Sequence, residues 1–214
     1  MPINIEKYHQ LISELKGKAT LVAVSKTKPV ADLQALYDLG QRDFGENYVQ
    51  ELVDKQAILP KDIRWHFIGH LQSNKVKLIA PFVYLIHGVD SESLLKEINK
   101  QAAKNNRIID CLLQIFIARE ETKFGLDETE FKQIINNRSD YANVRLTGVM
   151  GMASYSTNQE QVKNEFVSLD NLYHSQPDFT TLSMGMSGDY PIAIKAGSNM
   201  VRIGSLLFGE RSQK

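Results

Sequence analysis

Short apolar runs alternate with longer amphipathic stretches along the chain. Within each run the apolar residues are continuous rather than alternating with polar ones, as is typical of parallel strands buried on both faces. Eight runs in 214 residues leave about 27 residues for each unit, close to the roughly 30 that a strand, a helix and their loops need. The runs cover residues 20–25, 42–47, 64–69, 82–88, 108–118, 143–153, 179–185 and 200–204.

The stretches between the runs carry apolar residues at helical spacing. A further stretch of this kind precedes the first run, over residues 5–15. The apolar faces consist of Ile5, Tyr8, Leu11, Ile12 and Leu15; of Leu33, Leu36 and Tyr37; of Leu94, Leu95 and Ile98, after the capping pair Asp90 and Ser91; of Phe131, Ile134 and Ile135; and of Phe166, Leu169 and Tyr173. Alternating strands and helices predict an α/β fold.

We interpret this order as a single (β/α)8 barrel domain of the TIM type that spans residues 1–214 and has an extra N-terminal helix. An open, doubly wound sheet is the alternative, because the number of strands does not prove that the sheet closes. In a barrel, function lies at the C-terminal ends of the strands. The residues that follow each run are therefore the candidates for chemistry.

Composition narrows the class of protein. Lys and Arg together number 25, as do Asp and Glu, so the formal net charge is zero. This balance argues against binding to nucleic acid or to an anionic membrane surface, and no run approaches the roughly 20 residues of a membrane-spanning helix. The N-terminus lacks the pattern of a secretory signal, and the lone Cys111 excludes an intramolecular disulfide. We therefore expect a cytoplasmic protein.

Lys26 follows the first apolar run directly and is predicted to lie at the mouth of the barrel. A lysine with a desolvated side chain can act as an amine nucleophile and form a Schiff base with a carbonyl compound. The alternative is a lysine at a strand end that extends its ammonium group into solvent.

Two Gly-Ser turns follow the last two strands. Residues 182–189 close the seventh strand and open a helix with Ser187 as its predicted N-cap, and Gly204 and Ser205 follow the eighth. Loops at these positions hold phosphate in many barrels, although either turn alone is also a common capping arrangement. Gly197 precedes the eighth strand, so we interpret the residues around it as structural, with Gly197 just after a helix end.

Other polar residues in or after the runs are weaker candidates. Arg202 lies in an otherwise apolar strand and must find a partner or face water, while Asn47 and His66 could line the same mouth or be structural. His66 and His70 lack the setting of a zinc site, so no metal is predicted. Cys111 lies within an apolar run and is expected to be a packing residue.

Five segments, taken together, resemble the pyridoxal phosphate homeostasis proteins, which are barrels similar to the N-terminal domain of alanine racemase. They are LVAVSKTKP at 21–29, FGENYVQE at 44–51, WHFIGHLQSNKVK at 65–77, LSMGMSGDYPIAI at 182–194 and GSNMVRIGSLLFGER at 197–211. The resemblance implies that Lys26 forms a Schiff base with pyridoxal 5′-phosphate (PLP). It implies that the phosphate is surrounded by Ser183, Ser187, Gly204 and Ser205.

The same resemblance implies that Arg202 faces the pyridine nitrogen and that Asn47 and His66 lie near the cofactor ring. Lys123 matches a lysine of a Ser-Lys-x-Gly turn in the family, with Thr122 in place of the serine. An arginine at the ring nitrogen disfavours its protonation and weakens the electron sink that most PLP enzymes need. The chain also ends ten residues after Gly204, so we expect no room for the second domain that alanine racemases carry.

The resemblance therefore implies a PLP carrier that buffers and delivers the cofactor without robust catalysis. The expected partners are PLP itself and, transiently, PLP-dependent apo-enzymes, and the expected oligomeric state is a monomer. A weak amino-acid racemase is the alternative within the same cofactor chemistry; it would need a second base opposite Lys26. A barrel enzyme that acts on a sugar phosphate without PLP is the third possibility.

Overall fold

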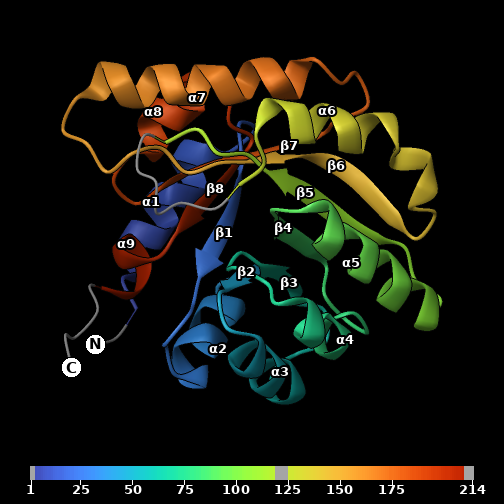
Figure 1. Cartoon of the computed structure of the whole chain (residues 1–214). Helices are drawn as coiled ribbons and strands as arrows, with labels where there is room; N and C mark the ends of the chain where they lie inside the picture. The colour runs from blue at the N-terminus through green and yellow to red at the C-terminus, as the bar shows by residue number, and fades with distance from the viewer. Residues whose placement is uncertain (1–2, 119–124, 210–214) are drawn as a thin grey trace.

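Eight parallel strands form a closed barrel in the computed structural model, which describes residues 3–118 and 125–209 (Figure 1). Each strand pairs with the next along the chain, and β1 pairs with β8, so the sheet has no open edge. The strands are β1 (Thr20–Val24), β2 (Asp43–Glu46), β3 (Arg64–Phe67), β4 (Leu85–Val89), β5 (Ile109–Gln114), β6 (Val144–Met150), β7 (Thr181–Met186) and β8 (Met200–Ile203). The predicted barrel is confirmed, and the open sheet is excluded.

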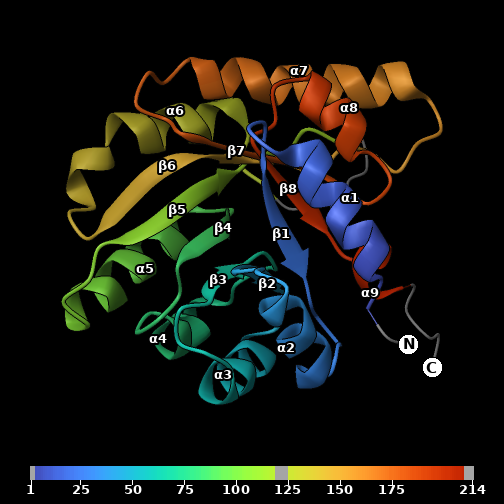
Figure 2. The same cartoon turned by 180° about the vertical axis from the view of Figure 1, so that it is seen from behind.

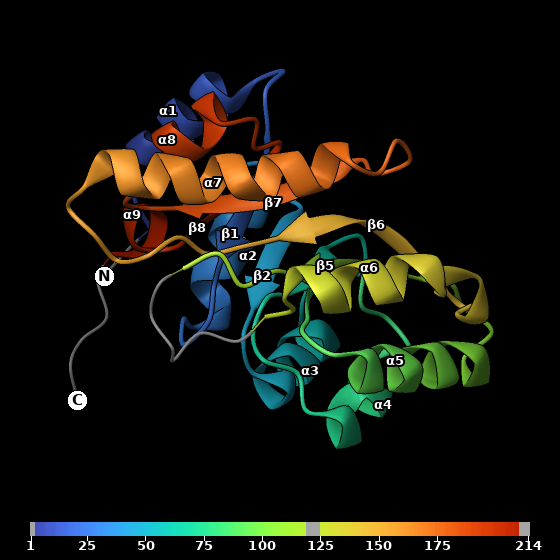
Figure 3. The same ribbon diagram turned by 45° about the horizontal axis from the view of Figure 1, so that its top comes forward.

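Helices surround this barrel on its outer side (Figures 1 and 3). They are α1 (Ile5–Leu15), α2 (Val30–Asp38), α3 (Val49–Ile58), α4 (Val76–Ile79), α5 (Glu92–Lys104), α6 (Glu128–Asn136), α7 (Gln159–His174), α8 (Tyr190–Lys195) and α9 (Ser205–Phe208), with 3₁₀ turns at Ser73–Lys75 and Arg138–Asp140. The five amphipathic faces singled out in the sequence all fall on helices, and Ser91 caps α5 as expected. No helix in the described part of the chain is long and apolar enough to cross a membrane.

The N-terminal helix α1 precedes β1 and does not connect two strands. It lies against α8 and α9 (Figure 2). The Tyr190 hydroxyl donates a hydrogen bond to Glu14 Oε2 at 2.9 Å, and the Asn4 amide donates to the Leu207 carbonyl at 2.8 Å. Leu11 is fully buried beneath these contacts. The extra helix thus supports the last two helices of the barrel, which follow β7 and β8.

Two apolar cores form on the two faces of the sheet because successive strand residues point to opposite sides. The larger core fills the space between strands and helices and includes Phe44, Phe67 and Phe166. The smaller one lies inside the barrel and consists of Val22, Leu85, Leu112, Met150 and Met200. This inner core fills the centre of the barrel, so a ligand can enter at the mouth but cannot pass through.

The loop between β7 and α8 differs from the prediction that Ser187 caps the following helix. Helix α8 begins at Tyr190 and its N-cap is Asp189, so the predicted capping role of Ser187 is wrong. Asp189 Oδ1 instead accepts a hydrogen bond from the Met186 amide at 2.6 Å, which turns the chain before the helix starts. Gly197 has a φ of 100° just after the end of α8, as expected for the residue that follows a helix C-cap.

Candidate functional site

A cavity of about 290 Å³ lies at the C-terminal ends of the strands. Six of the residues predicted for the site line it: Lys26, Asn47, Ser187, Arg202, Gly204 and Ser205. They come from the loops after β1, β2, β7 and β8, from β8 itself and from the start of α9. The barrel therefore brings together residues that are as much as 179 positions apart, as between Lys26 and Ser205.

Lys26 reaches the cavity because of its place after β1. Val22 belongs to the inner core, and Val24 lines the cavity, so the alternating pattern also points Lys26 inward. Ser25 faces the opposite side and is fully buried against the helices. Lys26 itself is partly buried.

The two Gly-Ser turns form another part of the cavity wall, and the turn after β8 lies beside the end of β1. The Gly204 amide donates a hydrogen bond to Ser187 Oγ at 3.3 Å and so joins the loop after β7 to the loop after β8. A Cβ atom built on Gly188 would meet no other atom within 4 Å, so this part of the wall borders open space. The turns thus present small side chains, hydroxyl groups and backbone to the cavity.

The lining is strongly cationic for a chain with zero net charge. Lys26, Lys28 and Arg202 border the cavity, and no carboxylate does so among the described residues. Lys28 Nζ donates to the carbonyl of Phe208 at 2.8 Å, which fastens the loop after β1 to the end of α9. Three cationic side chains in one lining favour an anionic ligand.

Asn47 adds an unused acceptor to this lining. Its Oδ1 atom is buried and accepts no hydrogen bond from any described residue. Buried polar atoms are nearly always paired in folded proteins. This amide oxygen is thus an exception that the described part of the chain leaves unpaired.

Arg202 is nearly inaccessible, at 4% exposure, although it borders the cavity. Its Nη1 donates to the Ser183 carbonyl at 2.8 Å and to Ser183 Oγ at 2.6 Å, and its Nη2 donates to the Gly151 carbonyl at 3.0 Å. Burial lowers the pKa of Arg202 to about 10. The guanidinium group therefore stays charged at neutral pH and is held rigidly at the base of the cavity.

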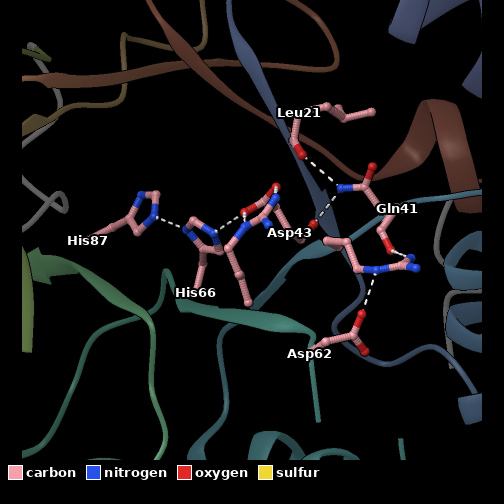
Figure 4. Close-up of polar contacts among 8 residues, drawn as sticks. Leu21, Gln41, Asp43, Asp62, His66 and His87 are labelled. Atoms are coloured by element: carbon pink, nitrogen blue, oxygen red, sulfur yellow. Dashed lines mark hydrogen bonds and ion pairs between the residues drawn. The ribbon is translucent and has the colours of Figure 1, made fainter. Parts of the chain in front are cut away.

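Ser183 and His66 do not line the cavity, although both were predicted for the site. Each is fully buried below it, inside the barrel. His87 Nδ1 lies 3.0 Å from Ser183 Oγ. His87 Nε2 lies 2.8 Å from His66 Nδ1, and His66 Nε2 lies 3.0 Å from Asp43 Oδ1 (Figure 4). The structure thus connects these two residues to Arg202 through a buried polar chain.

Two members of the buried polar chain, His87 and Asp43, were not predicted as site residues from the sequence. His87 lies in an apolar run, and Asp43 precedes the FGEN motif. A polar residue at an inward position of a buried strand is the signal that could have identified both. The buried polar chain ends at Asp43, whose Oδ1 also accepts a hydrogen bond from Arg64 Nε at 2.7 Å.

The buried polar chain carries charges at its two ends and not in its middle. Burial lowers the pKa of His66 and, more strongly, that of His87, which also lies near the positive charge of Arg202. Burial would raise the pKa of Asp43, but hydrogen bonds from His66 and Arg64 outweigh it and lower the pKa. Both histidines are therefore neutral near pH 7, between a cationic Arg202 and an anionic Asp43.

Neutral histidines allow the direction of each hydrogen bond to be assigned. Arg202 donates to Ser183, so the Ser183 hydroxyl donates to His87 Nδ1. His87 then donates from Nε2 to His66 Nδ1, and His66 donates from Nε2 to Asp43. Ser183, His87 and His66 each have both a donor and an acceptor partner, so the polar chain fixes Ser183 and, through it, Arg202.

The other residues singled out in the sequence lie away from the cavity or outside the described residues. Lys123 and Thr122 lie outside the described residues. Cys111 is fully buried and burial raises the pKa of its thiol, in keeping with a packing residue. In the described part of the chain no three His, Cys, Asp or Glu side chains come together as a metal site.

Comparison with known proteins assigns this protein to a family. The family model for the N-terminal domain of alanine racemase matches residues 3–212. The pyridoxal phosphate homeostasis protein of Aquifex aeolicus is 41% identical over 90% of this chain and 87% of its own, and that of Escherichia coli is 39% identical over 90% and 86%. The chain belongs to the pyridoxal phosphate homeostasis protein family.

Solved structures agree with this membership. PipY of Synechococcus elongatus, determined with PLP bound, is 33% identical and superposes with a TM-score of 0.88 over 95% of this chain and 99% of its own. An alanine racemase from Bartonella henselae superposes with a TM-score of 0.75 at 18% identity, over 97% of this chain and 60% of its own. The homeostasis proteins thus share the barrel fold of that larger enzyme.

Proposed function

We propose that the protein binds PLP in the cavity at the barrel mouth and takes part in its homeostasis by holding and delivering the cofactor. The observation that carries this proposal is the placement of an amine, Lys26, in a cavity with two further cations and no carboxylate among its described lining residues. PLP combines a phosphate dianion with an aldehyde, and so matches both features. The homeostasis name of the relatives and the PLP-bound PipY support the choice of ligand.

When bound, PLP supplies an aldehyde that condenses reversibly with a lysine amine to a Schiff base, with release of one water. Lys26 supplies the amine, which must first lose its proton. The hydroxyl and amide groups of Ser187, Gly204 and Ser205 would bind the phosphate. Asn47, which also lines the cavity, would contact the cofactor.

Arg202 supports a carrier rather than an enzyme. Its fixed positive charge, at the base of the cavity, disfavours a second positive charge on a pyridine nitrogen nearby. An unprotonated ring withdraws electrons weakly, so carbanion chemistry receives little assistance. Met186 lines the cavity and is 37% exposed, so an acceptor protein could contact this part of the lining.

Substitution Lys26→Ala tests the proposal directly. We expect purified wild-type protein with added PLP to show a visible absorption band, and borohydride to attach the cofactor to the peptide that contains Lys26. Lys26→Ala should lose both, whereas Lys132→Ala on the exposed surface of α6 should keep both. A band that survives in Lys26→Ala would contradict the assignment of the amine.

Delivery is tested separately with a PLP-dependent apo-enzyme. The loaded protein should activate it faster than the rate at which PLP dissociates spontaneously. Equal rates would remove delivery from the proposal and leave binding. The monomeric state and the cytoplasmic location stay predictions, the first of which sedimentation would test.

A further inference from the structure

A buried ion cluster lies behind Lys26, on the outer face of the barrel and away from the cavity. It consists of Glu46 at the end of β2 and of Glu51 and Lys55 on α3. Lys55 Nζ lies 2.7 Å from Glu46 Oε1 and 2.6 Å from Glu51 Oε1. Lys55 is 4% exposed and Glu46 is fully buried. Burying such charges is costly, and apolar residues of similar size often stabilise a protein as well or better. Packing alone therefore does not account for the cluster.

Each member of the cluster binds the turn that carries Lys26. Lys55 Nζ donates to the Ser25 carbonyl at 2.7 Å, and Ser25 Oγ donates to Glu46 Oε1 at 2.6 Å. The Thr27 amide donates to Glu51 Oε1 at 2.6 Å. The residues immediately before and after Lys26 are thus both anchored to the same three side chains.

The anchored turn has an unfavourable backbone conformation. Residues 25–28 form a four-residue turn, closed by a hydrogen bond from the Lys28 amide to the Ser25 carbonyl at 3.1 Å, and Thr27 in its third position has a φ of 63°. Turns with a positive φ there ordinarily use glycine, and for a β-branched residue this conformation is an outlier. Surrounding contacts must therefore hold it, and those of the cluster are the ones that reach the Thr27 amide.

We propose that Lys55, together with Glu46 and Glu51, is a positioning residue for Lys26: the cluster holds the turn in the conformation that directs the Lys26 amine into the cavity. This inference rests on the proposed function for its consequence, PLP capture, but the effect on the turn itself does not. The cluster faces away from the cavity, and none of its members lines it. Its loss should therefore weaken reaction at Lys26 more than it weakens binding at the cavity wall.

The first experiment needs no cofactor. Lys55→Met removes the charge that joins the two glutamates, and Glu51→Ala removes the acceptor of the Thr27 amide. In the ligand-free protein, hydrogen exchange at the Thr27 amide should become about tenfold faster or more in both variants, because the turn opens without its anchor. Lys132→Met is the matched control, since Lys132 forms the same type of i, i+4 pair with Glu128 on the exposed surface of α6.

The second experiment separates reaction at Lys26 from binding at the wall. Lys55→Met should raise the apparent Kd for PLP about tenfold, but change the Kd for pyridoxine 5′-phosphate less than about twofold. Pyridoxine 5′-phosphate has an alcohol in place of the aldehyde and cannot condense with an amine. Lys55→Arg, which keeps a charge and donors, should fall between Lys55→Met and wild type.

Rescue by glycine distinguishes positioning from a general structural effect. Thr27→Gly adopts a positive φ without strain, so the turn then depends less on the cluster. The double variant Thr27→Gly/Lys55→Met should recover most of the PLP affinity that Lys55→Met loses. Failure of the rescue, or equal loss of affinity for both ligands, would overturn the proposal.

The outcomes also separate this inference from the proposed function. If wild-type protein forms no Schiff base with PLP, the proposed function fails, and the exchange rate of the Thr27 amide still decides whether the cluster anchors the turn. If wild-type protein captures PLP and Lys55→Met captures it equally well, the positioning role is wrong while the proposed function stands.

Discussion

His87 connects two parts of the barrel that are far apart in the sequence, because it accepts from Ser183 and donates to His66. Ser183 in turn accepts from Arg202. Removing the imidazole leaves a buried hydroxyl without its acceptor and a buried ring nitrogen without its donor. Each unsatisfied buried group costs roughly 1 to 3 kcal/mol.

Substitution His87→Leu should therefore lower the free energy of unfolding by about 3 kcal/mol. His87→Gln should lose less, since an amide can both accept and donate. Urea denaturation near pH 7 measures both variants. The exposed His9 supplies the control, and His9→Leu should stay within about 0.5 kcal/mol of wild type. An equal loss in His87→Leu and His87→Gln would contradict the inference that the cost comes from the two partners that His87 leaves unsatisfied.

Some residues of the site could be placed from the sequence and others could not. Lys26 and the two Gly-Ser turns could be placed at the mouth because each directly follows a strand, and strand ends are visible in the sequence. The depth of His66 and Ser183 could not, because it depends on partners such as His87, which is 96 positions from Ser183. Nothing local in the sequence pairs them.

At the scale of the elements, strands β5 and β6 pair with an irregular register. Cys111 lies opposite Leu146 and Leu112 lies opposite Gly148, so Thr147 is an extra residue in β6. The bulge brings Gly148 against the neighbouring strand β7. A Cβ atom on Gly148 would lie 1.7 Å from the Thr181 carbonyl oxygen.

Gly148→Ala should consequently destabilise the protein by about 3 kcal/mol, because a backbone atom and not a flexible side chain must give way. Gly188→Ala is the matched control, since its Cβ would meet nothing within 4 Å. Thermal or urea unfolding of the two variants gives the comparison. Similar stabilities would mean that β6 and β7 separate easily at this point.

The apolar runs predicted all the strands of the described barrel but overestimated several ends. The fourth run begins at Phe82, whereas β4 begins at Leu85; Val83 is buried without joining the strand ladder. The fifth run extends to Ala118, whereas β5 ends at Gln114. Apolar residues beside a strand also pack against helices, so hydrophobicity marks burial and not hydrogen-bonded pairing. The misplaced N-cap at Ser187 has a different cause, since serine and aspartate are both common N-cap residues and Asp189 is the one that immediately precedes the helix.

For the molecule as a whole, the polar chain through the barrel makes folding depend on pH. His66 and His87 are fully buried and their pKa values lie below the ordinary 6.5, mainly because of burial. In the unfolded chain both titrate near 6.5. Below that pH the unfolded state binds protons that the native state does not, so stability is complete above pH 6.5 and falls as the pH drops.

Each histidine that stays neutral in the native state removes about 1.4 kcal/mol of stability per pH unit below 6.5. We therefore expect the free energy of unfolding to fall by roughly 2 to 3 kcal/mol between pH 7.5 and pH 5.5. Glu46 acts in the opposite direction, because burial, opposed by Lys55, raises its pKa and makes the native state bind a proton first. The double variant His66→Gln/His87→Gln isolates the histidines: it should be less stable than wild type at pH 7.5 but should lose much less on acidification. If wild type and the double variant instead lost the same free energy of unfolding on acidification, the two buried histidines would have to take up protons in the native state.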